Sequence, residues 1–321
     1  MKISRIFIIG AGTMGTKIAH RCIVSGLETM LYDKYPEVID KAVAQIQQWL
    51  SERIKQGHIT VEQAEAARAR LHSNPTLSEG VGSADLVIET VPENLDLKRQ
   101  VLAEIDDLLD PAAFVCSNSS SLPGSKMAGS LSRPERFFNI NFSMPEEPAD
   151  KLVELMRSAK TADEALVAGE TFVRMLGMVP IVTYREIMGF SFNRVWRAIK
   201  REVLHLVDQG YSDHQDIDRA WMMEFGTPFG PFGLMDIVGL DVIRDIEEQY
   251  YLDSGEPRDK PPRILDDMIS RGELGVKSGR GFYAYPNPDY KAQAWLLKED
   301  AYREDIKDKL SNIARSTSNV E

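Results

Sequence analysis

The sequence predicts an α/β domain with a doubly wound sheet, followed by a second domain that is all α. Three observations support this prediction. The 321-residue length suits two domains. The first half alternates short β-branched runs with amphipathic stretches, and no such run follows Tyr184. We therefore place the domains at residues 1–185 and 186–321.

Each short apolar run of the first half has the composition of a buried strand. The predicted strands are RIFIIG, ETMLYD, DLVIET, AFVCSN and GMVPIVTY, and the predicted helices begin near Thr13, Pro36 and Asp96. Helices that separate successive strands make crossover connections, which join parallel strands. The first domain is therefore expected to be doubly wound.

The second half contains helical patterns separated by glycine or proline. These are NRVWRAIKREVLHLVDQG, HQDIDRAWMMEFG, GLDVIRDIEEQYYLD and PPRILDDMISRG. Helices without strands predict an all-α domain that starts near Glu186. The polar tail from YPNPDY onward is expected to be peripheral.

The composition narrows the classes of partner. Lys and Arg number 38 against 49 Asp and Glu, and the net charge of -11 predicts no general attraction to nucleic acid or anionic membranes. No apolar run approaches about 20 residues and none resembles a signal peptide, so we expect a soluble, cytoplasmic protein. Cys22 and Cys116, in a predicted helix and strand, form neither a disulfide framework nor a metal cluster, and no metal is expected.

A glycine motif follows the first predicted strand and opens the first predicted helix. Gly10, Gly12 and Gly15 are spaced G-x-G-x-x-G, which allows a tight turn and a close approach of a pyrophosphate to the helix N-terminus. Asp33 ends the next strand, where its carboxylate can accept both ribose hydroxyls and repel a 2'-phosphate. The pattern favours NAD, although the neighbouring Lys34 leaves NADP open.

Several ordered motifs resemble the L-3-hydroxyacyl-CoA dehydrogenase family over roughly residues 3–285. They are GAGTMG, DLVIETVPENLDLK, SNSSSL, RPERF, KLVELM, GFSFNR, GPFGLMDIVGLD and LGVKSGRGFYAY. The resemblance implies a Rossmann-like domain, a helical domain that dimerises, and a cleft between them for cofactor and substrate.

The resemblance also implies roles for single residues. Glu93 and Lys98 would lie near the nicotinamide ribose, Lys277 would reach the cofactor from the second domain, Ser120 would bond the substrate oxygen, and Asn193 would complete the polar cluster. The expected cofactor-binding residues are Gly10, Gly12, Thr13, Met14, Gly15, Asp33, Glu93, Lys98, Asn118 and Lys277.

These residues also have purely structural alternatives. Glu93, Asn94 and Lys98 could cap and pair at the start of a helix. The serines Ser119–Ser121 could simply form a turn, and Asn193 could bond only its own backbone.

The segment after RPERF departs from the family. The family has a G-x-H-F-F-N-P pattern there, whose histidine is the general acid/base and is oriented by a glutamate in K-L-V-E. In this chain Asn139 replaces the glycine, Asn141 the histidine, Ser143 the second phenylalanine and Met144 the asparagine, whereas Glu154 matches the glutamate after one extra residue. An amide cannot exchange a proton near neutral pH, so Asn141 can donate a hydrogen bond but cannot relay protons.

The proton carrier must therefore be sought elsewhere. The five histidines are expected to pack or to lie at the surface: His20, His58, His72, His205 and His214. Glu154, freed from an imidazole partner, is the best candidate, because burial favours its acid form and it can act through a water. Glu146 and Glu147 could bind a cationic substrate or lie in solvent.

A second departure concerns CoA. In short bacterial members of the family, lysines hold the CoA phosphates, and Glu52 and Gln56 occupy those positions here. Arg53 and Lys55 point to other faces of the predicted helix. An acid smaller than an acyl-CoA is therefore a credible substrate.

The favoured hypothesis is an NAD-dependent oxidoreductase that transfers a hydride between nicotinamide and the carbinol carbon of a 3-hydroxy acid or its thioester. Ser120 and Asn141 would bind the reacting oxygen, Asn193 would support them, and Glu154 would handle the proton. The alternatives are a 3-hydroxyacyl-CoA dehydrogenase acting on CoA thioesters and an NAD-binding sensor or structural protein that has lost catalysis. The amphipathic RVWRAIKREVLHLV adds the expectation of a homodimer.

Overall fold

The computed structural model describes residues 3–73, 76–142 and 152–298 of the chain. The chain divides into two units, Met1–Arg194 and Val195–Glu321. The division falls within helix α7, which extends from Phe190 to Asp208. The domain boundary expected at residues 185 and 186 stays a prediction.

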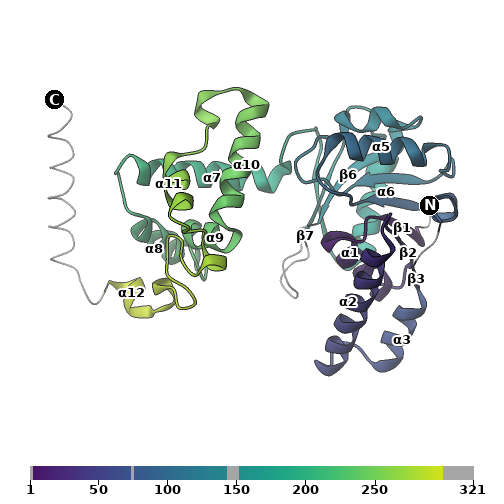
Figure 1. Ribbon diagram of the computed structural model, residues 1–321, viewed down its shortest axis with the longest axis horizontal. Coiled ribbons are helices and arrows are strands. Elements are labelled where there is room, and N and C mark those ends of the chain that lie inside the picture. The colour runs from purple at the N-terminus through teal and green to yellow at the C-terminus, as the bar shows by residue number, and fades with distance from the viewer. Residues whose placement is uncertain (1–2, 74–75, 143–151, 299–321) are drawn as a thin grey trace. The chain divides into compact units, whose positions relative to one another are not determined.

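The first unit is built on one eight-stranded sheet with the order β3-β2-β1-β4-β5-β6-β7-β8 (Figure 1). Strands β1 to β6 are parallel, whereas β7 is antiparallel to β6 and parallel to β8. The strands are β1 Arg5–Ile9, β2 Glu28–Tyr32, β3 Leu71–Ser73, β4 Leu86–Glu89, β5 Phe114–Ser117, β6 Phe137–Phe142, β7 Leu152–Met156 and β8 Val179–Thr183. The predicted doubly wound sheet is confirmed, and β3, β6 and β7 are additions to the strands predicted from the sequence.

Helices of the first unit cover both faces of this sheet. Ile6 and Ile8 of β1 pack into one core, whereas Phe7 and Ile9 pack into another, because successive strand side chains point to opposite faces. The helices are α1 Thr13–Val24, α2 Pro36–Lys55, α3 Val61–Ala69, α4 Leu77–Ser83, α5 Leu95–Asp106 and α6 Asp163–Met175. The predicted starts at Thr13 and Pro36 are confirmed, and α5 begins one residue before Asp96.

The described part of the second unit contains helices and no strand, as predicted. After α7 it contains α8 His214–Phe225, α9 Pro231–Val238, α10 Leu240–Ser254, α11 Arg263–Ser270 and α12 Gln293–Leu297. Helix α9 has only 8 residues and lies between Gly230 and Gly239, which is why its periodicity is weak in the sequence.

Two buried aspartates organise the core of the second unit. Asp218 accepts hydrogen bonds from the backbone N–H groups of Phe232 and Gly233 at 2.8 and 2.9 Å, which caps α9. Burial raises the pKa of Asp218 to about 6, against these hydrogen bonds, which lower it. Asp236 accepts from the backbone N–H of Tyr283 at 2.9 Å. The hydroxyl of Tyr283 also donates to Asp218 at 3.0 Å, so the two carboxylates tie this part of the chain to α8 and α9.

One expectation about the tail is wrong for the residues that the structure describes. Tyr290 is buried in the core of the second unit, and Tyr285 and Trp295 pack against that core. Trp295 also stacks under the guanidinium of Arg219, 4.2 Å from the ring centroid. The aromatic residues anchor this polar stretch, so residues 285–298 are part of the unit.

Cys22 lies in α1 and Cys116 in β5, the predicted helix and strand, and both are buried free thiols. Burial raises the pKa of both thiols, which favours the unreactive protonated form. Over the described residues, no helix combines the length and the apolar composition needed to cross a membrane.

Candidate active site

The glycine loop joins β1 to the N-terminus of α1. Gly15 packs directly on the loop, since a Cβ there would lie 1.8 Å from the carbonyl oxygen of Gly10. A Cβ on Gly12 would meet nothing within 4 Å, and Gly12 caps α1 without a side-chain hydrogen bond. The N-terminus of α1 is therefore uncapped by a side chain and open at Gly12 and Thr13, which suits a pyrophosphate.

Asp33 lies beside this loop at the end of β2. Its Oδ2 accepts a hydrogen bond from the backbone N–H of Ala11 at 2.9 Å, and its Oδ1 accepts from that of Tyr35 at 3.0 Å. The side chain is half-buried. Asp33, which is expected to bind the ribose, is thus hydrogen-bonded to the glycine loop, which is expected to bind the pyrophosphate.

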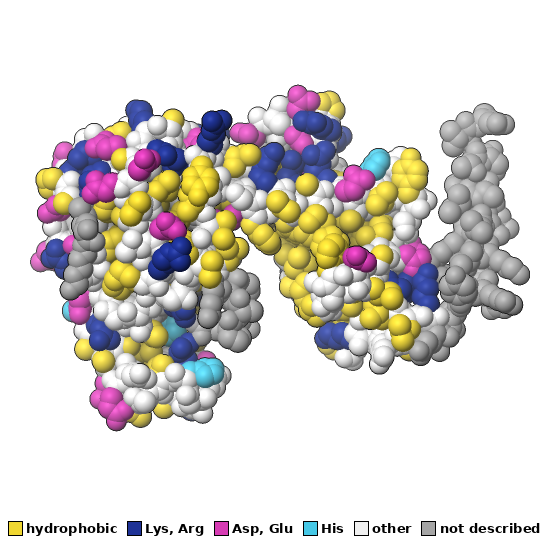
Figure 2. Space-filling view, turned by 180° about the vertical axis from the view of Figure 1, so that it is seen from behind, with side chains coloured by type: hydrophobic (Ala, Val, Ile, Leu, Met, Phe, Trp, Pro, Cys, Tyr) yellow, Lys and Arg dark blue, Asp and Glu magenta, His cyan; other side chains and the backbone are white. Residues whose placement is uncertain are grey.

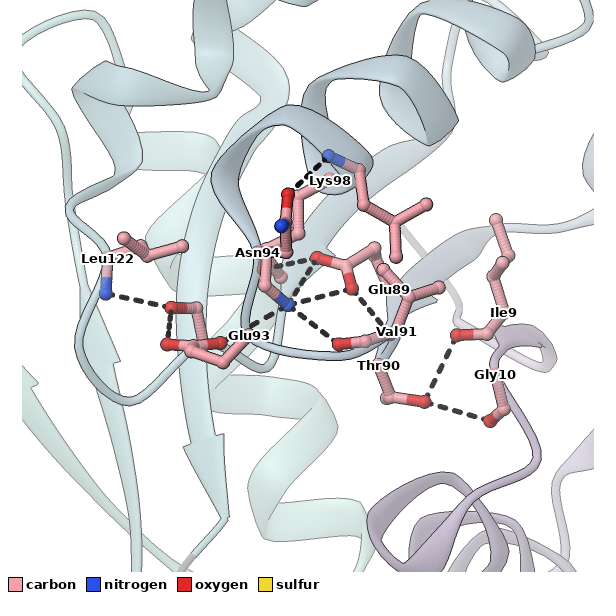
Figure 3. A network of polar contacts seen from close by, with 12 residues as sticks. Ile9, Gly10, Glu89, Thr90, Val91, Glu93, Asn94, Lys98 and Leu122 are labelled. Atoms are coloured by element: carbon pink, nitrogen blue, oxygen red, sulfur yellow. Dashed lines mark hydrogen bonds and ion pairs between the residues drawn. The ribbon is translucent and has the colours of Figure 1, made fainter.

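The hydroxyl of Thr90 holds the glycine loop in place, a role that the sequence did not predict. Its hydroxyl contacts the carbonyl oxygens of Ile9 and Gly10 at 3.0 and 2.8 Å (Figure 3). Because Thr90 follows β4, which pairs with β1, it ties the start of the loop to the neighbouring strand.

A buried ion pair lies between β4 and α5. Lys98 is 1% exposed and Glu89 0%, and the ammonium lies 2.9 and 3.1 Å from the two carboxylate oxygens (Figure 3). Glu89 also accepts from the hydroxyl of Ser117 at 2.5 Å and from the N–H of Val91 at 2.6 Å. Sequence reasoning missed Glu89, whose only signal was a carboxylate at the end of an apolar strand.

Glu93 holds the serine loop, which we define as residues 118–122. Its Oε1 accepts from the hydroxyls of Ser119 and Ser121, both at 2.6 Å, and its Oε2 lies 3.4 Å from the ammonium of Lys98 (Figure 3). Burial alone would raise the pKa of Glu93, but the serine hydrogen bonds and the charge of Lys98 outweigh it and lower the pKa. Glu93 is thus held as an anion.

The serine loop presents Ser120 at its tip. Ser120 is exposed, and its hydroxyl makes no hydrogen bond within the described residues. Asn118, at the start of the loop, is half-buried and accepts from the backbone N–H of Phe142 at 3.1 Å. The loop is therefore joined to the end of β6, where Asn141 lies.

Asn141 and Glu154 face each other across the antiparallel pair of β6 and β7. The amide Nδ2 of Asn141 donates to Oε2 of Glu154 at 3.3 Å, and the backbone N–H of Phe192 donates to Oε1 at 2.8 Å. Asn141 is 8% exposed and Glu154 is 1% exposed. The extra residue before Glu154 thus leaves its carboxylate opposite position 141.

The start of α7 brings the Phe192 donor to this carboxylate. Gly189 and Phe190 both have positive φ angles, of 82° and 54°. A positive φ is rare for a bulky residue and costs about 1–3 kcal/mol, so surrounding contacts must hold it. Phe190 is 1% exposed, which supplies those contacts. Asn193 follows in the first turn of α7, half-buried.

The histidines have other surroundings. The ring of His20 contacts that of Trp49 in a tilted arrangement, with centroids 5.4 Å apart, and His72 lies 2.9 Å from a carboxylate oxygen of Glu28. The remaining three are His58, exposed after α2, His205, beside Tyr211, and His214, among Phe232, Phe282 and Tyr283. No group of three or more metal-ligating side chains occurs among the described residues.

Other sequence predictions concern residues outside the cluster around Asn141. In the second unit, Lys277 pairs with Asp241 at 2.5 Å, a hydrogen bond that lowers the pKa of Asp241. On α2, Glu52 accepts from Gln48 at 2.7 Å, and Gln56 is the exposed C-cap. Ser143, Met144, Glu146 and Glu147 lie outside the described residues.

Comparison with known proteins shows which family models the chain matches. Residues 5–187 match the model of the 3-hydroxyacyl-CoA dehydrogenase NAD binding domain, and residues 189–285 match the model of the 3-hydroxyacyl-CoA dehydrogenase C-terminal domain. Together the two matches cover most of the chain.

Similar proteins include dehydrogenases of different substrates. A 5-formyl-3-hydroxy-2-methylpyridine 4-carboxylate 5-dehydrogenase of Mesorhizobium japonicum is 31% identical over 90% of this chain and 93% of its own. A probable 3-hydroxybutyryl-CoA dehydrogenase of Bacillus subtilis is 31% identical over 89% of this chain and 98% of its own. The crystal structure of (S)-3-hydroxybutyryl-CoA dehydrogenase from Ralstonia eutropha matches with a TM-score of 0.82 and 32% identity, over 89% of this chain and all of that one.

Proposed function

Because the chain belongs to the 3-hydroxyacyl-CoA dehydrogenase family and is an NAD-dependent oxidoreductase, we propose that it acts on a 3-hydroxy acid or its thioester through an amide and carboxylate site. Bound NAD would accept the hydride when the carbinol carbon is oxidised, and bound NADH would donate it in the reverse reaction. The observation that carries the proposal is the contact of Asn141 Nδ2 with Glu154 Oε2 at 3.3 Å. This contact supports the proposal because a hydrogen-bond donor lies beside the carboxylate that we propose as the proton acceptor.

Each residue of the site has one task in this proposal. The exposed hydroxyl of Ser120 and the second amide hydrogen of Asn141 donate to the reacting oxygen, and Asn193 supports them. Glu154 takes or returns the proton at Oε2 through a water, because its 1% exposure leaves little room for direct contact. Its Oε1 is oriented by the N–H of Phe192.

The proposed cofactor residues fit NAD at the glycine loop. The open N-terminus of α1 suits the pyrophosphate, and Asp33 suits the ribose hydroxyls. Lys98 is buried, so we propose that it acts on the nicotinamide side by fixing Glu93. The proposed set is Gly10, Gly12, Thr13, Met14, Gly15, Asp33, Glu93, Lys98, Asn118 and Lys277.

Asp33 is expected to set the choice of dinucleotide. NADH should bind more tightly than NADPH, and Asp33→Ala should narrow the difference in Kd, because the carboxylate that repels a 2'-phosphate is removed. Asp96→Ala, which removes an exposed carboxylate of α5, is the control and should leave both constants unchanged. Equal affinity of the unmodified protein for NADH and NADPH would refute this role.

Within this proposal, a small free 3-hydroxy or 3-oxo acid is favoured over a CoA thioester as the substrate. Glu52 and Gln56 place no cation where CoA phosphates would need one, and the overall charge is acidic. The name of the Mesorhizobium japonicum relative contains no CoA, whereas two other relatives are named for 3-hydroxybutyryl-CoA. An enzyme for CoA thioesters is the second candidate, and a catalytically lapsed NAD-binding sensor or structural protein is the third.

A nicotinamide absorbance assay separates the three candidates. The panel comprises CoA thioesters, free 3-hydroxy acids and free 3-oxo acids, with NADH binding measured in parallel. Turnover of free acids supports the proposal, and turnover confined to thioesters favours the second candidate. Binding of NADH without turnover of either class favours the third.

We also propose a cytoplasmic homodimer that forms through the second unit. Figure 2 shows hydrophobic side chains gathered on one face of this unit, and Val195, Val242 and Ile246 are among its exposed apolar residues. Light scattering at micromolar concentration is expected to give twice the mass of one chain. A monomer at that concentration would contradict the proposal.

A further inference from the structure

The serine loop is held from two sides. On one side Glu93 accepts the hydroxyl hydrogen bonds of Ser119 and Ser121. On the other side the amide Nδ2 of Asn139 donates to the carbonyl oxygen of Leu122 at 3.1 Å. Ser120 lies between these two attachments and makes no hydrogen bond of its own within the described residues. Its position therefore depends on the backbone that its neighbours hold.

Asn139 is an unusual residue for its place in β6. It is 1% exposed, and it lies two residues before Asn141, so both amides are on the same face of the strand. Its Oδ1 has no hydrogen-bond partner in the described structure. Buried polar atoms without a partner are uncommon and costly, so the residue is expected to have a use beyond packing.

The orientation of the Asn139 amide is fixed by its surroundings. A Cβ added to Gly124 would lie 2.4 Å from Oδ1, which means that this oxygen packs against the glycine that follows the serine loop. The Leu122 carbonyl needs a donor, and only the Nδ2 end of the amide can supply one. The side chain thus fits tightly between Leu122 and Gly124.

We propose that Asn139 is a positioning residue that sets the place of the Ser120 hydroxyl for the reaction. This inference rests on the proposed function, in which Ser120 donates to the reacting oxygen. Without the Asn139 donor, the loop keeps its attachments to Glu93 and, through Asn118, to Phe142, but it loses the one at Leu122, and Ser120 shifts. A misplacement of about 1 Å can cost ~100-fold in rate.

The test is a double-mutant cycle between Asn139→Leu and Ser120→Ala. Leucine keeps a similar size, removes the donor and introduces no charge. Asn139→Leu is expected to lower kcat by about 10-fold with little change in KM, because a donor that meets the developing charge acts on the transition state. When Ser120→Ala is already present, Asn139→Leu should lower kcat by less than about 2-fold. The control Asn287→Leu, at an exposed position, should change neither constant.

Gly124→Ala is a second variant that disturbs the side chain of Asn139, and it is used if Asn139→Leu folds poorly. Its methyl group would push against Oδ1, so its loss of kcat should also disappear in the Ser120→Ala background. If Ser120→Ala lowers kcat, and Asn139→Leu then lowers kcat by the same factor with and without Ser120→Ala, the positioning role is overturned and the proposed function stays intact. A neutral Ser120→Ala would overturn the positioning role together with the task proposed for Ser120, whereas loss of turnover in Glu154→Gln tests the rest of the proposed function.

Discussion

Replacing Glu154 by glutamine is expected to remove most turnover and to leave NADH binding intact. Glutamine keeps the size of the side chain and a carbonyl oxygen for the N–H of Phe192, but it cannot ionise. General acid/base catalysis contributes roughly 100 to 10,000-fold, so kcat should fall within that range. The profile of kcat against pH should also lose the limb that this carboxyl group sets.

Glu104→Gln is the matched control for this change. Glu104 is an exposed carboxylate of α5, and its replacement should leave kcat and the pH profile unchanged. If Glu154→Gln keeps substantial turnover, the proton carrier must be Glu146, Glu147 or a bound water.

Removing Glu89 is expected to destabilise the first unit by about 3–5 kcal/mol, the cost of leaving a buried charge without its partner. In a Glu89→Leu variant the ammonium of Lys98 would remain buried, with Val91 O at 3.0 Å and the Glu93 carboxylate at 3.4 Å. The hydroxyl of Ser117 would also lose its acceptor. The free energy of unfolding, measured in urea, gives the effect.

The double variant Glu89→Leu with Lys98→Met separates charge from packing. Replacing a buried ion pair by apolar residues is often close to neutral, so the double variant should be more stable than Glu89→Leu alone. If the double variant is less stable than Glu89→Leu, the unpaired charge of Lys98 is not the main cause of the lost stability. NADH binding of the refolded double variant then shows whether Glu93 still holds the serine loop.

The sequence predicted the parts of the fold that local patterns determine. β-branched runs and glycine spacing located β1, β2, β4, β5 and β8 and the loop that opens α1. Strand β6 was not predicted, because Asn139 and Asn141 interrupt its apolar pattern, and neither was β7, whose direction relative to β6 is a long-range property. The tail was misjudged because a few aromatic residues outweigh a polar composition.

The candidate site was predictable only in part. The motif alignment identified Asn141 and Glu154, whose contact at 3.3 Å connects facing strands. It gave no role to Glu89, Thr90 or Asn139, because each acts through partners remote in sequence. The φ of Phe190 likewise depends on tertiary packing.

The central claim is that Asn141 and Glu154 form a different site and not a damaged version of the family site. Asn139 occupies the face of β6 beside position 141, and Oε1 of Glu154 is already bonded to Phe192. An imidazole at position 141 would face Oε2 of Glu154, but Asn139, Ser143 and Met144 replace the family residues that surround it. Glu52 and Gln56 would also leave the CoA phosphates without cations, and Glu52→Lys with Gln56→Lys should chiefly lower KM for CoA substrates.

The most direct test is kcat of Asn141→His with 3-hydroxybutyryl-CoA and NAD, compared with the unmodified protein. Position 141 is compared as Asn and as His a second time in a protein that also carries Glu52→Lys and Gln56→Lys, so that weak CoA binding does not mask a gain in kcat. We expect kcat to remain within about tenfold of the unmodified value, because one substitution does not restore a catalytic constellation. A gain of roughly 100 to 10,000-fold, the full value of general acid/base catalysis, would contradict the claim and identify a lapsed acyl-CoA dehydrogenase.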